Sequence, residues 1–220
     1  MSRLAIFDCD GTLVDSGATI HRALRAAFTA HGLDCPPPAV SRKVIGLSLM
    51  EAMAMLAPDG DHEALSRTYK DAFIAMRQGG HVEEPLFDGI LPLLDALEAD
   101  GWLLAVATGK SDRGLRHCLE SHGLHARFVS LQTADRHPSK PHPAMALAAI
   151  TEAGASPASS VVIGDTSYDI GMALAAGAGA IGAAWGYHEP EELAAAGAHG
   201  IAGEPGEVLG MARQWVEKAA

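Results

Sequence analysis

The chain has 220 residues, 48% of them hydrophobic and 20% charged, which is ordinary for a soluble globular protein. A net charge of −11, without any lysine- or arginine-rich run, argues against a nucleic-acid partner, because such binding depends on basic contacts to phosphates. The chain opens directly into an apolar segment, with no basic region followed by a long apolar stretch. We therefore expect no signal peptide and no membrane span.

The first predicted strand covers Leu4 to Phe7 and ends at two acids, Asp8 and Asp10, which are followed by Gly11. Strand geometry directs the two carboxylates to the same side of the chain, where they repel each other unless a cation or a shared proton relieves them. Mg²⁺ suits this role, because it prefers oxygen ligands and is usually held by carboxylates, phosphate and water. One acid of such a pair can attack phosphorus, and the other can act as a general acid and base.

A helical block follows the first strand and contains no convincing strand of its own. An amphipathic pattern predicts a helix over residues 18–30, and the Pro36-Pro37-Pro38 run predicts a rigid break. Further helices are predicted over 48–56 and 62–77, before Gly79-Gly80 ends the block.

Helices and apolar strands then alternate to the end of the chain. Helices are predicted over 90–99, 112–122, 143–153, 170–176, 190–196 and 206–218. Strands are predicted over 102–107, 128–131, 160–163, 180–185 and, weakly, 199–202. This alternation predicts an α/β fold, with a Rossmann-like three-layer core around a mostly parallel sheet and a small α-helical domain. We expect residues 1–15 and 83–220 to form the core and residues 16–82 to form the helical domain.

Four groups of polar residues follow predicted strands or stand in loops between elements, where a parallel sheet would bring them to one rim. Asp8 and Asp10 form the first group. Thr108 and Gly109 form the second and offer a hydroxyl and a backbone N–H to phosphate oxygens. Lys140 is framed by prolines and could aim a positive charge at a phosphoryl group.

Asp165 and Asp169 form the fourth group and, with Asp8, would supply oxygen ligands to one metal. Each group also has a purely structural explanation: a solvated acidic turn, a helix cap at Thr108, a surface lysine, and a cap at Asp165 with a solvated Asp169. The four together favour a catalytic site, because separate explanations would require four coincidences at sites that the topology brings together.

These motifs resemble those of the haloacid dehalogenase-like hydrolase superfamily, and its phosphoglycolate phosphatase-like branch in particular. The resemblance spans essentially the whole chain and rests on Asp8-x-Asp10-Gly-Thr-Leu, Thr108, Lys140 and Gly-Asp165-x-x-x-Asp169, with the helical block as the family's cap. It implies that Asp8 is the nucleophile, that Asp10 is the general acid and base, and that Thr108 and Lys140 bind the phosphoryl group, beside the Gly109 N–H noted above. It further implies a Mg²⁺ site with Asp8, the backbone carbonyl of Asp10 and Asp165 as ligands, and with Asp169 assisting directly or through water.

The presence of Asp10 favours phosphate esters, because the superfamily's dehalogenases and phosphonate hydrolases lack that acid. The resemblance thus implies a Mg²⁺-dependent phosphatase that acts on a small phosphorylated metabolite through an aspartyl-phosphate, as a monomer or a homodimer. Arg42 and Lys43 stand in the cap stretch that reaches the site in relatives, and they are candidates for binding a second anionic group or for a solvated pair. We assign no function to Lys110, and we assign Cys9 to core packing.

Three alternatives remain open beside the phosphatase. The same intermediate serves a sugar-phosphate mutase, and the same fold serves an inorganic pyrophosphatase. A phosphate-binding protein without turnover is the non-enzymatic alternative, although a pure binder has no need of Asp10. The three scattered cysteines, Cys9, Cys35 and Cys118, form no Cys-x-x-Cys pair, and we expect a reduced, cytoplasmic setting.

Overall fold

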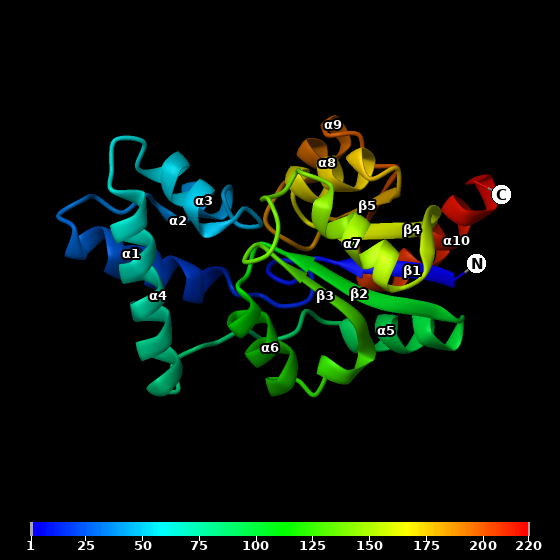
Figure 1. The fold of residues 1–220 in the computed structure, drawn as a ribbon, viewed down its shortest axis with the longest axis horizontal. Helices are drawn as coiled ribbons and strands as arrows, with labels where there is room; N and C mark the ends of the chain where they lie inside the picture. Colours follow the sequence, from blue (N-terminus) through cyan, green and yellow to red (C-terminus); the bar gives the residue numbers. More distant parts are fainter. Residues whose placement is uncertain (1, 220) are drawn as a thin grey trace.

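The centre of the molecule is a six-stranded, entirely parallel sheet in the order β3-β2-β1-β4-β5-β6 (Figure 1). We describe it from a computed structural model that covers residues 2–219. The strands are β1 (Ser2–Phe7), β2 (Trp102–Thr108), β3 (Phe128–Thr133), β4 (Ala155–Gly164), β5 (Gly179–Ala183) and β6 (Gly200–Ala202). The predicted α/β fold with a mostly parallel sheet is confirmed.

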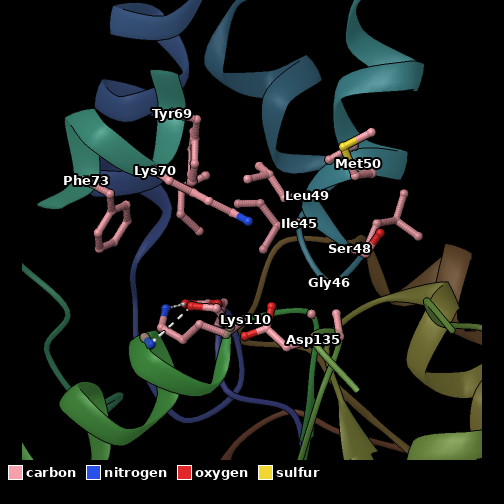
Figure 2. Close-up of a pocket in the computed structure, with 18 of the residues that line it drawn as sticks. Ile45, Gly46, Ser48, Leu49, Met50, Tyr69, Lys70, Phe73, Lys110 and Asp135 are labelled. Carbon is pink, nitrogen blue, oxygen red and sulfur yellow. Dashed lines mark hydrogen bonds and ion pairs between the residues drawn. The ribbon is translucent and has the colours of Figure 1, made fainter. Parts of the chain in front are cut away.

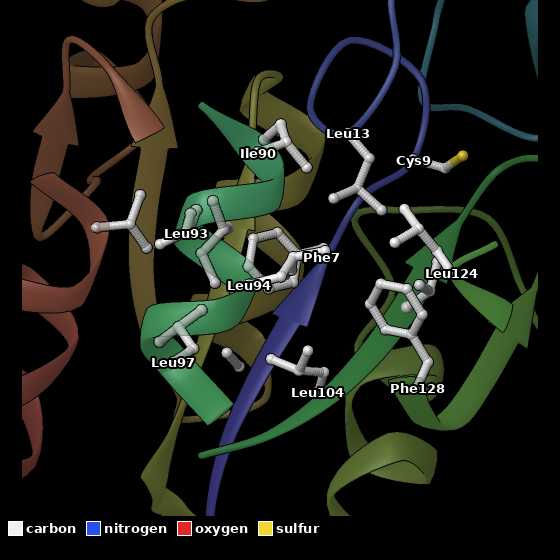
Figure 3. Packing of buried hydrophobic residues seen from close by; sticks show 14 of the residues in the cluster. Phe7, Cys9, Leu13, Ile90, Leu93, Leu94, Leu97, Leu104, Leu124 and Phe128 are labelled. Carbon is white, nitrogen blue, oxygen red and sulfur yellow. The ribbon is translucent and has the colours of Figure 1, made fainter. Parts of the chain in front are cut away.

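Helices cover both faces of the sheet because successive side chains of each strand point to opposite sides. Ala5 and Phe7 of β1 face α5 (Ile90–Ala99), α6 (Asp112–Ser121) and α10 (Val208–Ala219). Figure 3 shows Phe7 packed against the leucines of α5, which this helix presents at helical spacing. Leu4 and Ile6 face the other layer, which consists of α7 (Ala144–Glu152), α8 (Ser167–Ala175) and α9 (Pro190–Ala195).

Four helices lie beside the sheet rather than on it, and we call them the helical unit. They are α1 (Gly17–Ala30), α2 (Pro38–Arg42), α3 (Leu49–Leu56) and α4 (His62–Gln78). They enclose a hydrophobic cluster of their own, which includes Leu24, Phe28, Met53 and Leu65. The chain passes between the sheet and the unit twice, and Val14 and Leu86 pair across these two passages. This arrangement supports the proposal that residues 16–82 form a separate domain.

The structure differs most from the sequence prediction at three elements. The short helix α2 stands where only a proline break was predicted, because Pro38 occupies a first-turn position at which no N–H is needed. Strand β4 begins at Ala155 rather than at residue 160; its first half consists of small residues and a proline, so it has no apolar pattern that would predict a strand. Helix α8 begins at Ser167 rather than at residue 170.

Two short 3₁₀ turns, His125–Arg127 and Pro205–Glu207, complete the regular structure. Within residues 2–219, no helix is both long enough and apolar enough to cross a membrane.

Candidate active site

The carboxyl ends of the central strands bring together the residues that the motifs single out. Asp8 directly follows β1, Thr108 ends β2 and Asp165 directly follows β4. Because β1 pairs with both β2 and β4 in parallel, these three residues lie at one rim of the sheet. The register fixes this geometry: the Asp8 N–H donates to the carbonyl of Ile163, 2.9 Å away, at the end of the neighbouring strand.

Lys140 lies buried between two of the predicted site carboxylates and is not a surface lysine. Its Nζ is 2.8 Å from Asp8 Oδ1 and 2.7 Å from Asp169 Oδ1. Burial alone would lower the pKa of this ammonium, but Asp169 and Asp8 outweigh it and raise the pKa above its ordinary value. Lys140 therefore stays charged and neutralises part of an otherwise repulsive cluster.

Of the two carboxylate oxygens of Asp8, Oδ1 has hydrogen-bond and ion-pair partners, and Oδ2 has none among the described residues. Oδ1 accepts the backbone N–H of Cys9 at 2.6 Å and also contacts Lys140. Oδ2 is buried and has no hydrogen-bond partner within the described part of the chain. Burial raises the pKa of Asp8 to about 7, against the opposing effect of Lys140. A carboxylate in this position needs further positive charge to remain ionised.

Asp165 is fixed by hydrogen bonds at both of its carboxylate oxygens. Thr12 Oγ1 donates to Oδ1 at 2.8 Å, and the Tyr187 N–H donates to Oδ2 at 2.9 Å. Glycine at positions 11 and 186 leaves the room that this carboxylate occupies, because a Cβ at either position would collide with it. Burial, together with Asp169 and Asp8, raises the pKa of Asp165 well above its usual range.

Asp169 is buried at the start of α8 and is not a solvated residue. Thr166 is the N-cap of this helix, so the structural explanation that made Asp165 the cap does not hold. The Thr166 N–H and Oγ1 donate to Asp169 Oδ2 at 3.1 and 2.7 Å, which completes a capping box. The remaining oxygen, Oδ1, faces Lys140.

Three of these carboxylates form a group with the chemistry of a divalent-cation site. Oxygen atoms of Asp8, Asp165 and Asp169 all lie within 4.8 Å of one another. The donor set consists of oxygens only, and it includes the unpartnered Asp8 Oδ2, so the residues fit a hard cation such as Mg²⁺. The side chain of Asp10 is not part of this group.

The carboxylate of Asp10 turns instead toward the helical unit. Ser16 Oγ donates to Asp10 Oδ1 at 2.5 Å, and Lys110 Nζ donates to the same oxygen at 2.6 Å. Lys110 also donates to Glu84 Oε1 at 2.9 Å. Burial would lower the pKa of Lys110, but Asp10 and Glu84 outweigh it and raise the pKa well above its usual range. No sequence pattern indicates a function for this lysine, whereas the structure places it in direct contact with Asp10.

Thr108 and Gly109 lie where the sheet meets the helical unit. Thr108 Oγ1 accepts the Lys110 N–H at 3.2 Å, and Ser111 rather than Thr108 caps α6. Gly109 packs against the backbone carbonyls of Gly46 and Leu47, so that a Cβ at position 109 would collide with them. Glycine therefore allows the loop of the helical unit to approach the end of β2.

Arg42 and Lys43 are placed differently from the rest of the predicted set. Lys43 forms an ion pair with Glu192 of α9, and its backbone carbonyl accepts the Tyr168 hydroxyl at 3.1 Å. Arg42 is exposed at the end of α2. Neither residue lines the cavity beside Asp10. The cations of the helical unit that do line it are Lys70 and Arg77, for which no sequence motif provides a signal.

A cavity of about 450 Å³ separates the helical unit from the sheet and opens beside Asp10 (Figure 2). Asp10, Gly109 and Lys110 contribute to it from the sheet side. Helices α1, α3 and α4 and the loop 44–48 provide the opposite walls.

Comparison with known proteins agrees with this geometry. Residues 5–183 match the family model described as "Haloacid dehalogenase-like hydrolase". The chain is 36% identical to "Probable phosphatase IndB" of Dickeya dadantii over 217 residues, covering 96% of this chain and 94% of the relative. It is 33% identical to a phosphoglycolate phosphatase of Xylella fastidiosa, covering 86% of this chain and 83% of the relative.

A solved structure of a haloacid dehalogenase-like family hydrolase from Streptococcus pneumoniae superposes with a TM-score of 0.84 at 26% identity. The match covers 95% of this chain and 97% of that one. The family model covers most of the chain, and the four motifs lie in the segments where the structure builds the site. This chain belongs to the haloacid dehalogenase-like hydrolase family.

Proposed function

We propose that this protein is a Mg²⁺-dependent phosphatase that hydrolyses a small phosphate monoester through an aspartyl-phosphate on Asp8. The observation that carries the proposal is the free, buried Oδ2 of Asp8, which lies in a group of three carboxylates with Lys140 against it. The phosphatase and phosphoglycolate phosphatase names of relatives at 36% and 33% identity support the same reaction class.

In the first half-reaction, one carboxylate oxygen of Asp8 attacks phosphorus and the bond from phosphorus to the ester oxygen breaks. Asp10 gives its proton to the departing oxygen, so that a neutral alcohol leaves. Lys140 Nζ, Thr108 Oγ1 and the Gly109 N–H bind the equatorial phosphoryl oxygens, whose negative charge increases in the transition state.

In the second half-reaction, Asp10 accepts a proton from water as this water attacks phosphorus. The bond between phosphorus and Asp8 breaks, which releases inorganic phosphate and regenerates both acids. Ser16 and Lys110 both contact Asp10 Oδ1, and we propose that they hold the carboxylate in one orientation through both proton transfers.

Asp8, Asp165 and Asp169 would hold the metal, with the backbone carbonyl of Asp10 as a further ligand. When bound, the cation supplies positive charge that offsets the repulsion between the carboxylates and the phosphoryl oxygens. Thr12, Thr166 and the Tyr187 N–H orient the carboxylates by hydrogen bonds to Asp165 and Asp169.

The test is phosphate release from a panel of esters, with Mg²⁺, with chelator and with the Asp8→Asn variant. We expect release that requires Mg²⁺ and is abolished in Asp8→Asn, while the circular dichroism spectrum of the variant stays that of the wild type. Quenching the reaction during turnover and mapping peptides by mass spectrometry should locate a phosphoryl group on Asp8. Full activity of Asp8→Asn would refute the assignment.

The Asp10→Asn variant isolates proton transfer to the leaving group. We expect turnover of alkyl phosphates to fall about 10²–10⁴-fold, and turnover of an ester with an acidic leaving group, such as p-nitrophenyl phosphate, to fall much less.

The same panel separates the alternatives: phosphate that moves within a sugar without release indicates a mutase, and pyrophosphate as the best substrate indicates a pyrophosphatase. Metal-dependent binding without any product indicates a binding protein.

A further inference from the structure

The leaving group of the substrate must enter the cavity between the helical unit and the sheet. The ester oxygen has to meet Asp10, and Asp10 lines this cavity, whereas Asp8, Lys140 and Asp169 do not. Whatever the ester oxygen carries therefore extends away from the metal group, toward α4 and the loop 44–48. The walls of the cavity identify the chemistry of the alcohol.

Most of these walls are apolar. The side chains that α1, α3, α4 and the loop 44–48 contribute are mainly hydrocarbon or aromatic and include Ile20, Leu24, Ile45, Leu49, Tyr69 and Phe73. The rings of Tyr69 and Phe73 form a pair with centroids 6.0 Å apart. Lys110 Nζ lies 5.9 Å from the centre of the Phe73 ring, which places this ring directly beside the Asp10–Lys110 pair.

Lys70 brings a positive charge into the apolar part of the cavity. Figure 2 shows its side chain extending from α4, with Nζ in the space that Ile45 and Leu49 face. Within residues 2–219, no ion pair or hydrogen bond engages this ammonium. Arg77 adds a second cation farther along α4, where its guanidinium lies 5.5 Å from the centre of the Phe73 ring. An anionic substituent on the alcohol would give Lys70 a partner.

We propose that the substrate is a phosphorylated hydroxy acid with an aromatic or similarly large apolar side chain, and that Phe73 and Lys70 select its two parts. This inference rests on the proposed phosphatase reaction. The apolar side chain packs against Phe73, Tyr69 and Ile45, and the carboxylate pairs with Lys70. Hydrolysis gives the free hydroxy acid and inorganic phosphate.

The two-carbon glycolate is a poor match for this cavity, because it would leave the apolar walls unfilled. A sugar is also a poorer match, since most of its hydroxyls would lose water against the hydrocarbon side chains of these walls. A nucleobase needs donors and acceptors along its edge, whereas most side chains that the helical unit brings to the cavity are apolar. Within the described residues its polar ones there are Ser48, Tyr69, Lys70 and Arg77.

Four esters with alkyl leaving groups test the two parts separately. Ethyl phosphate carries neither part, 2-phosphoglycolate carries the carboxylate, benzyl phosphate carries the ring, and 2-phospho-3-phenyllactate carries both. We expect kcat/KM to rise about 10–100-fold with the ring and about 10-fold with the carboxylate, so that the fourth ester is the best substrate. Uridine 5′-monophosphate is added as the nucleotide comparison.

Two variants test which residue recognises the carboxylate of the substrate and which recognises its ring. Lys70→Met keeps the length of the side chain and should remove the advantage of 2-phospho-3-phenyllactate over benzyl phosphate. Phe73→Ala should reduce the advantage of benzyl phosphate over ethyl phosphate. Arg67→Met on the same helix and Met55→Ala on α3 are the matched controls, because both side chains are exposed and outside the cavity lining, and both variants should keep the wild-type ratios.

Calorimetry can measure how tightly the esters bind to the Asp8→Asn variant, and this measurement separates the inference from the proposed function. Tighter binding of 2-phospho-3-phenyllactate than of 2-phosphoglycolate, with no hydrolysis by the wild type, would support the pocket assignment and contradict the phosphatase. Hydrolysis with 2-phosphoglycolate, ethyl phosphate or uridine 5′-monophosphate as the best substrate would support the phosphatase and overturn the inference. Substrate ratios that are unchanged in both Lys70→Met and Phe73→Ala would overturn it as well.

Discussion

Lys110 shows how one buried cation can serve both the fold and the site. Its Nζ lies between Asp10 and Glu84, and all three side chains are at most 10% exposed. The first carboxylate belongs to the proposed acid, and the second stands on the segment that leads back from the helical unit. Lys110 therefore joins the rim of the sheet to the connection between the two parts of the chain.

We expect Lys110→Met to lower the free energy of unfolding by about 3–5 kcal/mol, because it leaves two buried carboxylates without their cation. The double variant Lys110→Met with Glu84→Gln should lose less, since it removes one of the uncompensated charges. Urea denaturation of both variants at neutral pH measures the difference. A loss below about 1 kcal/mol, which is the value of an exposed pair, would contradict this account.

The sequence indicated Asp8, Asp10, Thr108, Lys140, Asp165 and Asp169, because each stands at a strand end or in a loop near one, in a recognisable pattern. The distant partners of Asp10 and of its neighbour Ser16 had no such signal. Lys110 is 100 residues from Asp10 along the chain, and Tyr187, whose hydroxyl accepts the Ser16 N–H at 3.0 Å, is 171 residues from Ser16. Contacts of this kind depend on side-chain placement in three dimensions, which composition and periodicity do not encode.

At the scale of whole elements, a buried histidine stabilises the N-terminus of helix α8. His188 is 6% exposed, and its Nδ1 accepts the Ser167 N–H, which is one of the free donors of the first helical turn. Burial lowers the pKa of His188 below its ordinary value of 6.5, with the charges of Glu192 and Lys43 as smaller, opposed contributions. Protonation at Nδ1 would break the hydrogen bond to Ser167 and place a charge in a buried position.

This arrangement gives the stability a defined pH dependence. Because the folded-state pKa is depressed, the unfolded chain binds more protons as the pH falls through 6.5, so the full stability is present above that pH and declines below it. We expect His188→Gln to flatten the dependence of the unfolding free energy between pH 7 and pH 5, measured by urea denaturation. His117→Gln, at an exposed position on α6, is the matched control and should keep the wild-type slope.

Element prediction succeeded where the burial pattern was periodic and failed where it was not. The four buried positions of α5, Ile90, Leu93, Leu94 and Leu97, repeat at helical spacing, and its predicted range of 90–99 matches the structure. The first half of β4 carries small residues and a proline, so its pairing with the start of β1 had no hydrophobic signal. Tertiary pairing rather than local pattern makes that segment a strand.

At the scale of the whole molecule, the helical unit is fastened to the sheet by contacts of the loop 44–48 and of the residue before it. The Ser48 N–H donates to Ser139 Oγ at 2.8 Å, and the Tyr168 hydroxyl donates to the Lys43 carbonyl at 3.1 Å. Gly46 has a φ of +98° and packs so closely on Thr166 that a Cβ would lie 3.2 Å from its Oγ1. These contacts lie on the far side of the cavity from the two connecting segments, so they are placed to hold the cavity closed.

Opening of the cavity should therefore be a local event that these hydrogen bonds control. A hydrogen bond of this kind contributes about 1 kcal/mol, so we expect Ser139→Ala or Tyr168→Phe to raise the open population about 5-fold. If one opening motion breaks both contacts, the double variant should raise it about 25-fold.

Hydrogen exchange of the backbone amides of residues 44–48 reports this population, while the amides of β1 report global unfolding. Thr151→Ala is the control, because that hydroxyl bonds within α7 to Leu147. Faster exchange confined to the loop would establish a lid that opens without unfolding the sheet, whereas equal acceleration in β1 would show that the loop and the sheet open only together.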